Sequence, residues 1–212
     1  MGGRGRLIAL EGIDGSGKTT QARILAERSP ASMMTVTAEP GATALGAELR
    51  GLLLDPHLPP VAERTEALLL AADRAQHVAE VVAPALAAGR WVVTDRFSGS
   101  TLAYQGYGRG LDLDELRRLV DWATGGIEPD LNVLVDIPLD VARRRRAGGD
   151  DDRLESLGDP FHERVRSGYL ALAAADPGRW VVIDGTGGVD EVADRLSAAV
   201  TARLGLPGPA GL

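Results

Sequence analysis

Short runs of apolar residues alternate along this 212-residue chain with longer stretches in which apolar residues recur every three or four positions. The short runs predict buried strands at 7–10, 33–37, 91–94, 131–135 and 180–183. Strands that alternate with helices in this way form a parallel sheet covered by helices on both faces. The pattern therefore predicts a single α/β domain over 1–204, followed by a flexible Gly/Pro-rich tail at 205–212 that has little to bury.

The longest helical pattern runs from about residue 61 to residue 88. Helical spacing predicts one buried stripe, formed by Leu68, Ala71, Ala75, Val78, Val82 and Leu86. Pro84 predicts a kink or a break near the end of this run. Another face of this helix carries Leu70, Arg74 and His77. An arginine beside an apolar side chain is suited to binding the flat polar ring of a ligand. The alternative is a solvated arginine that pairs with an acid such as Asp73 or with a residue on another element.

Composition narrows the class of protein. The chain has 23 basic and 30 acidic residues and a net charge of −7, which argues against a general nucleic-acid surface because such surfaces neutralise phosphates. It has no cysteine, which excludes disulfides and thiolate zinc sites and fits a reducing compartment. No stretch approaches the roughly 18 apolar residues of a membrane span. We expect a cytoplasmic protein that binds neither nucleic acid nor membrane.

A phosphate-loop pattern follows the first predicted strand. The segment EGIDGSGKTTQ at 11–21 contains a glycine, four residues and then Gly-Lys-Thr. Glycines let backbone N–H groups converge on an anion, and the following helix directs its positive end to the same place. Lys18 would reach the terminal phosphates and Thr19 a magnesium ion. The expected ATP-binding residues here are Gly12, Ile13, Asp14, Gly15, Ser16, Gly17, Lys18 and Thr19.

Polar residues also follow other predicted strands, at the sheet edge where ligands bind in α/β proteins. Asp95 and Arg96 end the third strand, and a carboxylate there can organise magnesium while a planar guanidinium matches phosphate oxygens. The alternative is that Asp95 caps a helix and Arg96 lies on the surface. The hydroxyl and amide groups of 98–105 favour a binding site instead, because a core would not need them. The turns at 38–43 and 184–188 could border a ligand, but each is explained equally well as a plain connection between a strand and a helix.

An arginine-rich segment follows the fourth strand. Four arginines at 143–146 precede two glycines, three aspartates and Arg153. Consecutive residues fan out around a helix by about 100° each, so the four cannot all address one phosphate, and Arg143 and Arg146 share a face. The segment at about 143–158 predicts either a lid that brings arginine to a transferring phosphate or a charged solvated loop.

Together these motifs resemble the thymidylate kinase family, P-loop enzymes that phosphorylate dTMP with ATP and magnesium. The resemblance extends from Ile8 to about Asp184. It rests on the phosphate loop, EPGAT at 39–43, AADRAQHV at 71–78, DRFSGSTLAYQG at 95–106, PDL before the fourth strand, and DRLE and FHERVRSGYL further on. It implies a P-loop NTPase fold with a lid, ATP and dTMP as substrates, Mg²⁺ as cofactor, and a homodimer.

The resemblance implies roles by position. Asp14 would meet the 3′-hydroxyl of the acceptor sugar, Arg74 the thymine ring and Arg96 the acceptor phosphate, while Tyr104 stands where the family excludes a ribose 2′-hydroxyl. The implied acceptor-binding residues are Asp14, Glu39, Pro40, Leu70, Arg74, Arg96, Ser100, Thr101, Tyr104 and Gln105.

The resemblance also divides the catalytic work. Gly15 and Ser16 occupy loop positions where one branch of the family carries its catalytic arginine, so this chain resembles the branch with a lid arginine. Arg153 and one of Arg143 or Arg146 are then the expected arginine donors, and Arg143 and Arg146 would contact ATP. Thr19 and Asp95 would hold the metal. The implied catalytic set is Lys18, Arg96, Arg153, Asp95 and Asp14.

Three departures from the family pattern bear on the acceptor. Leu70 replaces a phenylalanine that stacks on thymine in many relatives, Ala38 replaces an arginine, and Phe97 replaces a tyrosine. A related kinase of the same fold that prefers another pyrimidine monophosphate is therefore the alternative. A GTP-dependent switch protein would need an Asn-Lys-x-Asp motif, and the one asparagine, Asn132, precedes a valine. A catalytically idle nucleotide sensor would not need Lys18 or the arginine-rich segment.

Overall fold

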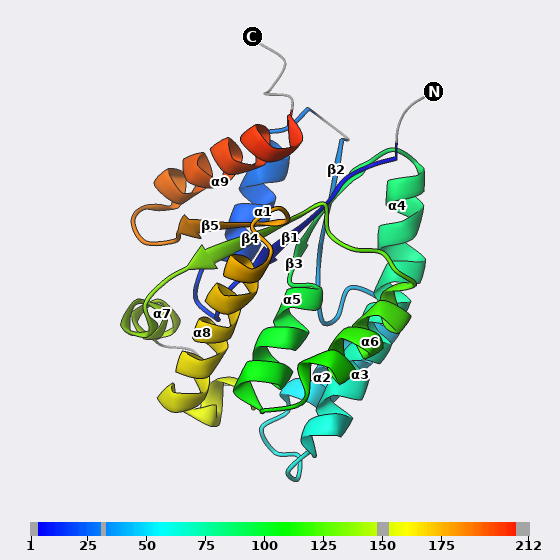
Figure 1. Cartoon of the computed structure of the whole chain (residues 1–212), viewed down its shortest axis with the longest axis vertical. Helices are drawn as coiled ribbons and strands as arrows, with labels where there is room; N and C mark the ends of the chain where they lie inside the picture. The colour runs from blue at the N-terminus through cyan, green and yellow to red at the C-terminus, as the bar shows by residue number, and fades with distance from the viewer. Residues whose placement is uncertain (1–3, 31–32, 148–152, 207–212) are drawn as a thin grey trace.

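One all-parallel sheet organises the chain (Figure 1). The computed structural model describes residues 4–30, 33–147 and 153–206. The strands lie in the order β2-β3-β1-β4-β5 and comprise β1 (Leu7–Glu11), β2 (Met34–Ala38), β3 (Trp91–Asp95), β4 (Leu131–Asp136) and β5 (Trp180–Asp184). Their positions confirm the predicted α/β class and the five-stranded parallel sheet.

Helices cover both faces of the sheet. On one face α1 (Lys18–Glu27) and α9 (Val189–Leu204) pack against side chains such as Ile8 and Leu10. On the other face Leu7 and Ala9 pack against α4 (Ala83–Ala87), and α8 (Asp159–Ala175) covers β4 and β5. Successive side chains of a strand point to opposite faces, so a strand covered on both sides needs a continuous apolar run. That requirement explains why β1, β3 and β4, whose residues are mostly buried, could be predicted.

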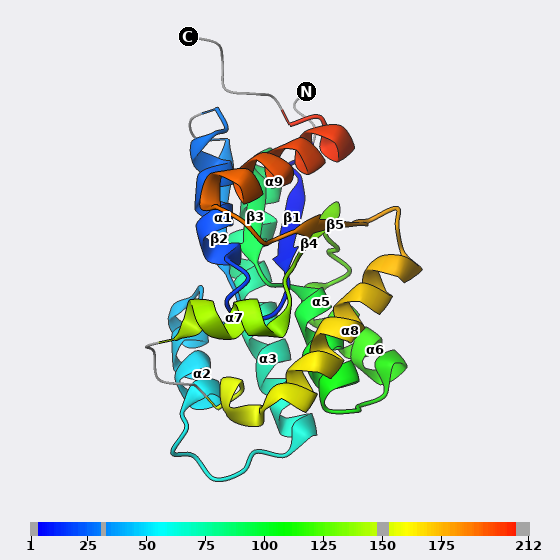
Figure 2. The same ribbon diagram turned by 90° about the vertical axis from the view of Figure 1, so that its left-hand side faces the viewer.

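The remaining helices form a layer beyond the carboxyl ends of the strands and beside the sheet (Figure 2). They are α2 (Ala44–Leu54), α3 (Glu63–His77), α5 (Ser98–Thr101), α6 (Leu113–Thr124) and α7 (Leu139–Arg146), with the π-helical turns η1 (Val78–Val82) and η2 (Leu102–Gly108) and the 3₁₀ turn η3 (Glu155–Leu157). None of the helices in the described ranges combines the length and the apolar character needed to cross a bilayer.

The long helix predicted over 61–88 is divided into three parts. α3 ends at His77, η1 inserts a π-helical turn, and α4 begins with Pro84 in its first turn, where a missing N–H is tolerated. The predicted buried stripe is wrong at Leu68, which is 59% exposed. Ala67 and Ala71, four residues apart, occupy the buried face of α3 instead, so the stripe passes beside Leu68.

The chain end differs from its prediction where the structure describes it. Gly205 ends α9 with a left-handed backbone, φ 67°, and Leu206, the second residue of the predicted tail, is buried in the core beside α9. Residues 207–212 lie outside the described residues, as do residues 148–152 of the predicted lid.

Candidate functional site

The phosphate loop connects β1 to α1. Gly15 and Gly17 have φ angles of 82° and 93°, a left-handed conformation that glycine adopts without a steric penalty. The Lys18 ammonium is nearly buried and donates to the Ile13 carbonyl at 3.0 Å and to Ser16 Oγ at 3.3 Å. Burial and the nearby charge of Arg96 lower the pKa of Lys18. The loop thus holds the Lys18 ammonium against one carbonyl and one hydroxyl, and within the described part of the chain no carboxylate forms a salt bridge with it.

Thr19, in the first turn of α1, meets Asp95, the last residue of β3. The Thr19 hydroxyl donates to Asp95 Oδ2, and Asp95 Oδ1 is buried without a hydrogen-bond partner in the described part of the chain. A hydroxyl and a carboxylate are oxygen ligands of the kind that Mg²⁺ accepts, and Mg²⁺ usually takes its other ligands from water and phosphates. The pair therefore fits a magnesium ion.

Arg96 follows β3 with a φ of 74°, a conformation that is rare outside glycine and often marks functional positions. Its guanidinium donates to Asp14 Oδ1 at 2.5 Å and to the Gly12 carbonyl at 3.0 Å. It also lies over the Tyr104 ring, 5.0 Å from the centroid, while the Tyr104 hydroxyl donates to Asp14 Oδ2 at 2.9 Å. Arg96 is thereby held beside the phosphate loop.

The buried carboxylate of Glu11 holds several neighbours of Arg96 in place. Glu11, at the end of β1, accepts hydrogen bonds from the Phe97 backbone N–H at 3.0 Å, from Ser100 Oγ at 2.6 Å and from the Tyr169 hydroxyl at 3.2 Å. Burial raises the pKa of Glu11. Because the Ser100 and Tyr169 hydroxyls also contact Arg96, each at 3.2 Å, Glu11 connects β1 to α8 and to the residues that hold the Arg96 fork.

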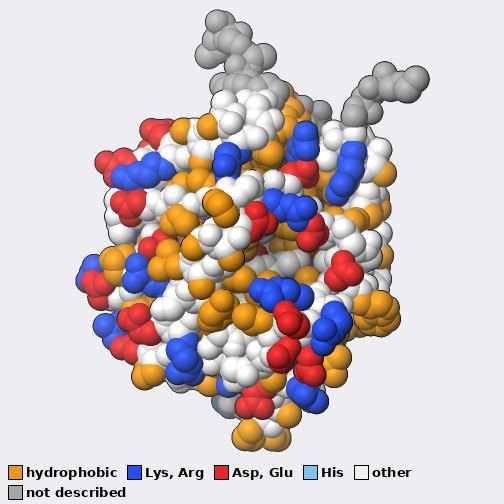
Figure 3. All heavy atoms as spheres, in the orientation of Figure 1, with side chains coloured by type: hydrophobic (Ala, Val, Ile, Leu, Met, Phe, Trp, Pro, Cys, Tyr) orange, Lys and Arg blue, Asp and Glu red, His pale blue; other side chains and the backbone are white. Residues whose placement is uncertain are grey.

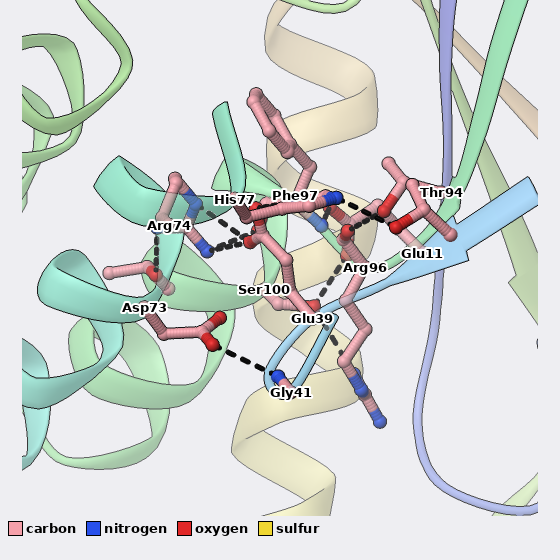
Figure 4. Close-up of polar contacts among 12 residues, drawn as sticks. Glu11, Glu39, Gly41, Asp73, Arg74, His77, Thr94, Arg96, Phe97 and Ser100 are labelled. Atoms are coloured by element: carbon pink, nitrogen blue, oxygen red, sulfur yellow. Dashed lines mark hydrogen bonds and ion pairs between the residues drawn. The ribbon is translucent and has the colours of Figure 1, made fainter. Parts of the chain in front are cut away.

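A second cluster ties α3 to the turn after β2. Arg74 donates to Glu39 Oε2 at 2.8 Å, to Thr101 Oγ1 at 2.8 Å and to the Phe97 carbonyl at 3.0 Å. His77 contacts the other Glu39 oxygen at 2.8 Å. Figure 4 shows Glu39, Arg74 and His77 close together, with the Arg96 side chain extending away from them. Of the alternative for Arg74, the pairing with an acid on another element is found, because Glu39 is that partner. Arg74 is buried rather than solvated, and Asp73 instead accepts from the Gly41 N–H at 2.9 Å.

Two clefts adjoin at this edge of the sheet. The inner cleft has about 670 Å³ of empty space, part of it open to solvent, and is lined by Asp14, Glu39, Pro40, Arg50, Leu53, Leu54, Leu70, Asp73, Arg74, Arg96, Ser100, Thr101, Tyr104, Gln105 and Leu154. The phosphate-loop cleft has about 1530 Å³ of empty space, part of it open to solvent. It is lined by residues 14–21, by groups at the ends of β2 and β3, by α2 and α7, and by the turn at 185–189 with the start of α9. Asp14, Glu39, Arg50 and Arg96 line both clefts.

Most of the residues predicted for the site come together here. All ten predicted acceptor-binding residues line the inner cleft. Asp14, Gly15, Ser16, Gly17, Lys18, Thr19 and Asp95 line the phosphate-loop cleft, while Gly12 and Ile13 contribute the carbonyls that accept from Arg96 and Lys18.

The predicted arginines of the lid lie elsewhere in this structure. Arg143 pairs with Asp159 at 2.5 Å, and Arg146 lies 3.5 Å from Glu155. Arg153 donates to the Leu53 carbonyl at 2.8 Å and lies 2.8 Å from Glu66 Oε2. None of these three arginines lines either cleft.

Sequence reasoning missed two arginines that do line the clefts. Arg145 on α7 donates to the Gly185 carbonyl at 2.9 Å and lines the phosphate-loop cleft. It lies three residues after the buried Ala142, and that helical spacing from the buried face was the available signal. Arg50 on α2 donates to the Pro40 carbonyl at 2.9 Å and lines both clefts. Nothing in the sequence distinguishes it from a surface arginine.

Comparisons with known proteins point to one family. A family model described as thymidylate kinase matches residues 10–196. A thymidylate kinase from Synechococcus sp. (strain JA-2-3B'a(2-13)) is 52% identical over 201 residues, covering 94% of this chain and 96% of the relative. One from Geobacter sp. (strain M21) is 45% identical, with 98% and 96% covered.

A solved structure gives the same assignment. The crystal structure of thymidylate kinase from Ehrlichia chaffeensis superposes with a TM-score of 0.76 at 30% sequence identity, covering 93% of this chain and 99% of that one. The fold is that of the P-loop NTPases, as the phosphate loop between β1 and α1 predicts. With a family model over most of its length and relatives of this similarity, the chain belongs to the thymidylate kinase family.

Proposed function

We propose that this protein transfers the γ-phosphate of ATP to dTMP, which yields ADP and dTDP for dTTP synthesis. The observation that carries the proposal is the common wall of the two clefts, formed by Asp14, Glu39, Arg50 and Arg96. A nucleotide in each cleft has its phosphates at that wall, where two arginines and the nearby Lys18 offset the repulsion between the phosphates.

Transfer is direct and in line. An oxygen of the acceptor phosphate forms a bond to the γ-phosphorus, the bond to the β–γ bridging oxygen breaks, and its electron pair leaves with ADP. No strong base is needed, because the attacking group is already an ionised phosphate oxygen. The work of the protein is to hold the two groups in line and to neutralise charge. Lys18 and Arg96 are placed for this purpose, because both are restrained by hydrogen bonds before substrate arrives.

Thr19 and Asp95 are the residues that would hold Mg²⁺. When bound, the ion supplies positive charge to the phosphates of ATP. Asp95 Oδ1, which has no hydrogen-bond partner among the residues that the structure describes, supports the assignment, since a buried carboxylate oxygen without a partner is costly. Arg153 remains our proposed catalytic arginine within a lid at about 143–158, and it must leave Glu66 to reach the phosphates.

The acceptor lies in the inner cleft. The base contacts Leu70, Arg74 and Gln105, which line that cleft. The sugar contacts Asp14 and Tyr104, whose side chains are hydrogen-bonded to each other at 2.9 Å. An aromatic ring held against the sugar leaves no room for a ribose 2′-hydroxyl, so deoxynucleotides are preferred.

A panel of monophosphates tests the proposal. ADP release is measured with ATP and each of dTMP, dUMP, dCMP, dAMP, dGMP and UMP. We expect dTMP to give the highest kcat/KM. A higher kcat/KM with another pyrimidine monophosphate would replace dTMP as the acceptor without changing the phosphate chemistry. Absence of ADP release with every acceptor would overturn the kinase proposal.

We also propose that the protein is a cytoplasmic homodimer. Apolar side chains are exposed beside the groove between α3 and α6, with Leu68 59% exposed and Trp122 82% exposed. Hydrophobic atoms protrude over α6 at the right-hand edge of Figure 3, and exposed apolar patches of this kind mark protein interfaces. A second copy of the chain would cover this face. The lack of cysteine fits the reducing cytoplasm.

A further inference from the structure

Glu66 on α3 is a fully buried carboxylate that lines neither cleft. It accepts hydrogen bonds from Gln105 Nε2 at 2.9 Å and from Arg109 Nε and Nη2 at 3.2 Å and 2.8 Å. Arg153 Nη2 lies 2.8 Å away. Burial opposes ionisation, but the hydrogen bonds from Arg109 and Gln105 outweigh it and lower the pKa of Glu66. At neutral pH its side chain is therefore ionised and only accepts hydrogen bonds.

The charge on Glu66 determines how Gln105 is turned. A side-chain amide can present either its oxygen or its nitrogen to a neighbour, but a carboxylate selects the nitrogen. Gln105 lines the inner cleft and is only 1% exposed, and its Oε1 has no hydrogen-bond partner among the described residues. A buried acceptor left unpaired destabilises the protein, because it has lost its hydrogen bonds to water. A ligand that brings a donor to this oxygen removes that cost.

We propose that Glu66 is a positioning residue for base selection, which holds the Gln105 amide so that its oxygen accepts from the ring N–H of an acceptor pyrimidine. This inference rests on the placement of the acceptor in the inner cleft proposed above. Thymine and uracil carry such a ring N–H, whereas the corresponding nitrogen of cytosine is an acceptor. Two acceptors facing each other repel, so the Glu66–Gln105 pair rejects cytosine nucleotides as well as favouring dTMP.

Glu66→Gln tests the pair. The variant keeps the shape of the side chain, but a neutral amide can donate as well as accept, so the orientation of Gln105 is no longer fixed. We expect the ratio of kcat/KM for dTMP over dCMP to fall about tenfold, because a misdirected buried hydrogen bond costs that much selectivity. The change is expected in the KM for dTMP, with the KM for ATP within about twofold of the wild type.

Arg109→Met is the matched control for a structural effect. It removes another partner of Glu66 but leaves the bond from Gln105 intact, and Arg109 lines neither cleft. We expect thermal stability to fall in both variants, whereas the dTMP:dCMP ratio falls only in Glu66→Gln. Gln105→Met removes the oxygen itself and is expected to give the same loss of selectivity. The double variant is then no less selective than Gln105→Met, since both changes remove one interaction.

The outcomes separate this inference from the proposed function. A folded Glu66→Gln protein with the wild-type dTMP:dCMP ratio would overturn the role of Glu66. So would full additivity of the Glu66 and Gln105 changes, or an equal fall of the ratio in Arg109→Met. A wild-type protein that fails to phosphorylate dTMP would instead overturn the proposed function.

Discussion

Asp14, at the wall that the clefts share, pairs with Arg96 and lies within the electrostatic influence of Lys18. Its carboxylate lies 2.5 Å from Arg96, and the two side chains are 30% and 14% exposed. Burial opposes its ionisation, but the charges of Arg96 and Lys18 outweigh that effect and hold the pKa of Asp14 well below its ordinary value of 3.8. The unfolded chain therefore takes up a proton at Asp14 at a higher pH than the folded protein does. The stabilisation is present above about pH 4 and is lost as the pH falls further.

Asp14→Asn removes this linkage. At about pH 7 we expect its free energy of unfolding to be about 1–3 kcal/mol below that of the wild type, because Arg96 loses a charged partner. The difference is expected to shrink between about pH 5 and about pH 3, since protonation of the unfolded chain destabilises only the wild type. Urea titrations across this range measure it. A difference independent of pH would show that the Asp14 charge does not stabilise the fold.

Leu70 is the residue of the inner cleft that departs most clearly from the family pattern. Leu70→Phe offers an aromatic face to the base, and aromatic stacking contributes about 0.5–1.5 kcal/mol beyond area burial. We expect the KM for dTMP to fall by roughly two- to tenfold, with kcat within about twofold of the wild type. Leu52→Phe is the control, because Leu52 is 49% exposed and lines neither cleft. A rise in KM would mean that the cleft has no room for the ring.

At the scale of elements, α7 presents arginines to two different surroundings. Arg145 donates to carbonyls of the phosphate-loop cleft, whereas Arg143 pairs with Asp159 outside it. We expect Arg145→Ala to raise the KM for ATP about tenfold, because it removes charge and hydrogen bonds from the cleft wall. Arg143→Ala is the same change on the same helix, and its KM for ATP is expected to stay within about twofold of the wild-type value. Steady-state kinetics with varied ATP decide between them, and the reverse ranking would contradict the placement of α7.

Arg153 has two possible roles that one variant distinguishes. If it reaches the transferring phosphate during turnover, Arg153→Ala lowers kcat by about a hundredfold or more while ATP binding changes little. If it only fastens its segment to Leu53 and Glu66, kcat stays near normal and stability falls. We expect the first result. Single-turnover rates, calorimetric ATP binding and thermal denaturation of the variant together measure both effects.

The elements and the site were not equally predictable from the sequence. Strands buried on both faces need apolar runs, so β1, β3 and β4 could be located to within about one residue. The phosphate loop could be located because glycine and lysine are required at set offsets. In contrast, the phase of four adjacent arginines depends on how α7 packs, and the partner of Arg153 depends on a carboxylate distant in sequence. Both features depend on packing between segments that are distant in the sequence, so no local sequence pattern could predict them.

At the scale of the molecule, α3 connects the active site to the proposed dimer face. It presents Leu70 and Arg74 to the inner cleft, keeps Glu66 buried, and exposes Leu68 beside the groove shared with α6. A partner packed on this groove would restrain α3 from its outer side. Dimer formation and acceptor binding are therefore expected to be coupled, because both depend on the position of one helix.

Leu68→Glu tests the face and the coupling together. A carboxylate in an apolar interface lacks a partner and is costly to bury, so we expect sedimentation velocity to give twice the chain mass for the wild type and one chain for the variant at about 10 µM. We also expect the KM for dTMP to rise severalfold in the variant, with little change for ATP. Val182→Glu is the control, since Val182 is 46% exposed on β5, at the far edge of the sheet from β2. A Val182→Glu protein that also becomes monomeric, or a Leu68→Glu protein that remains dimeric, would place the interface elsewhere.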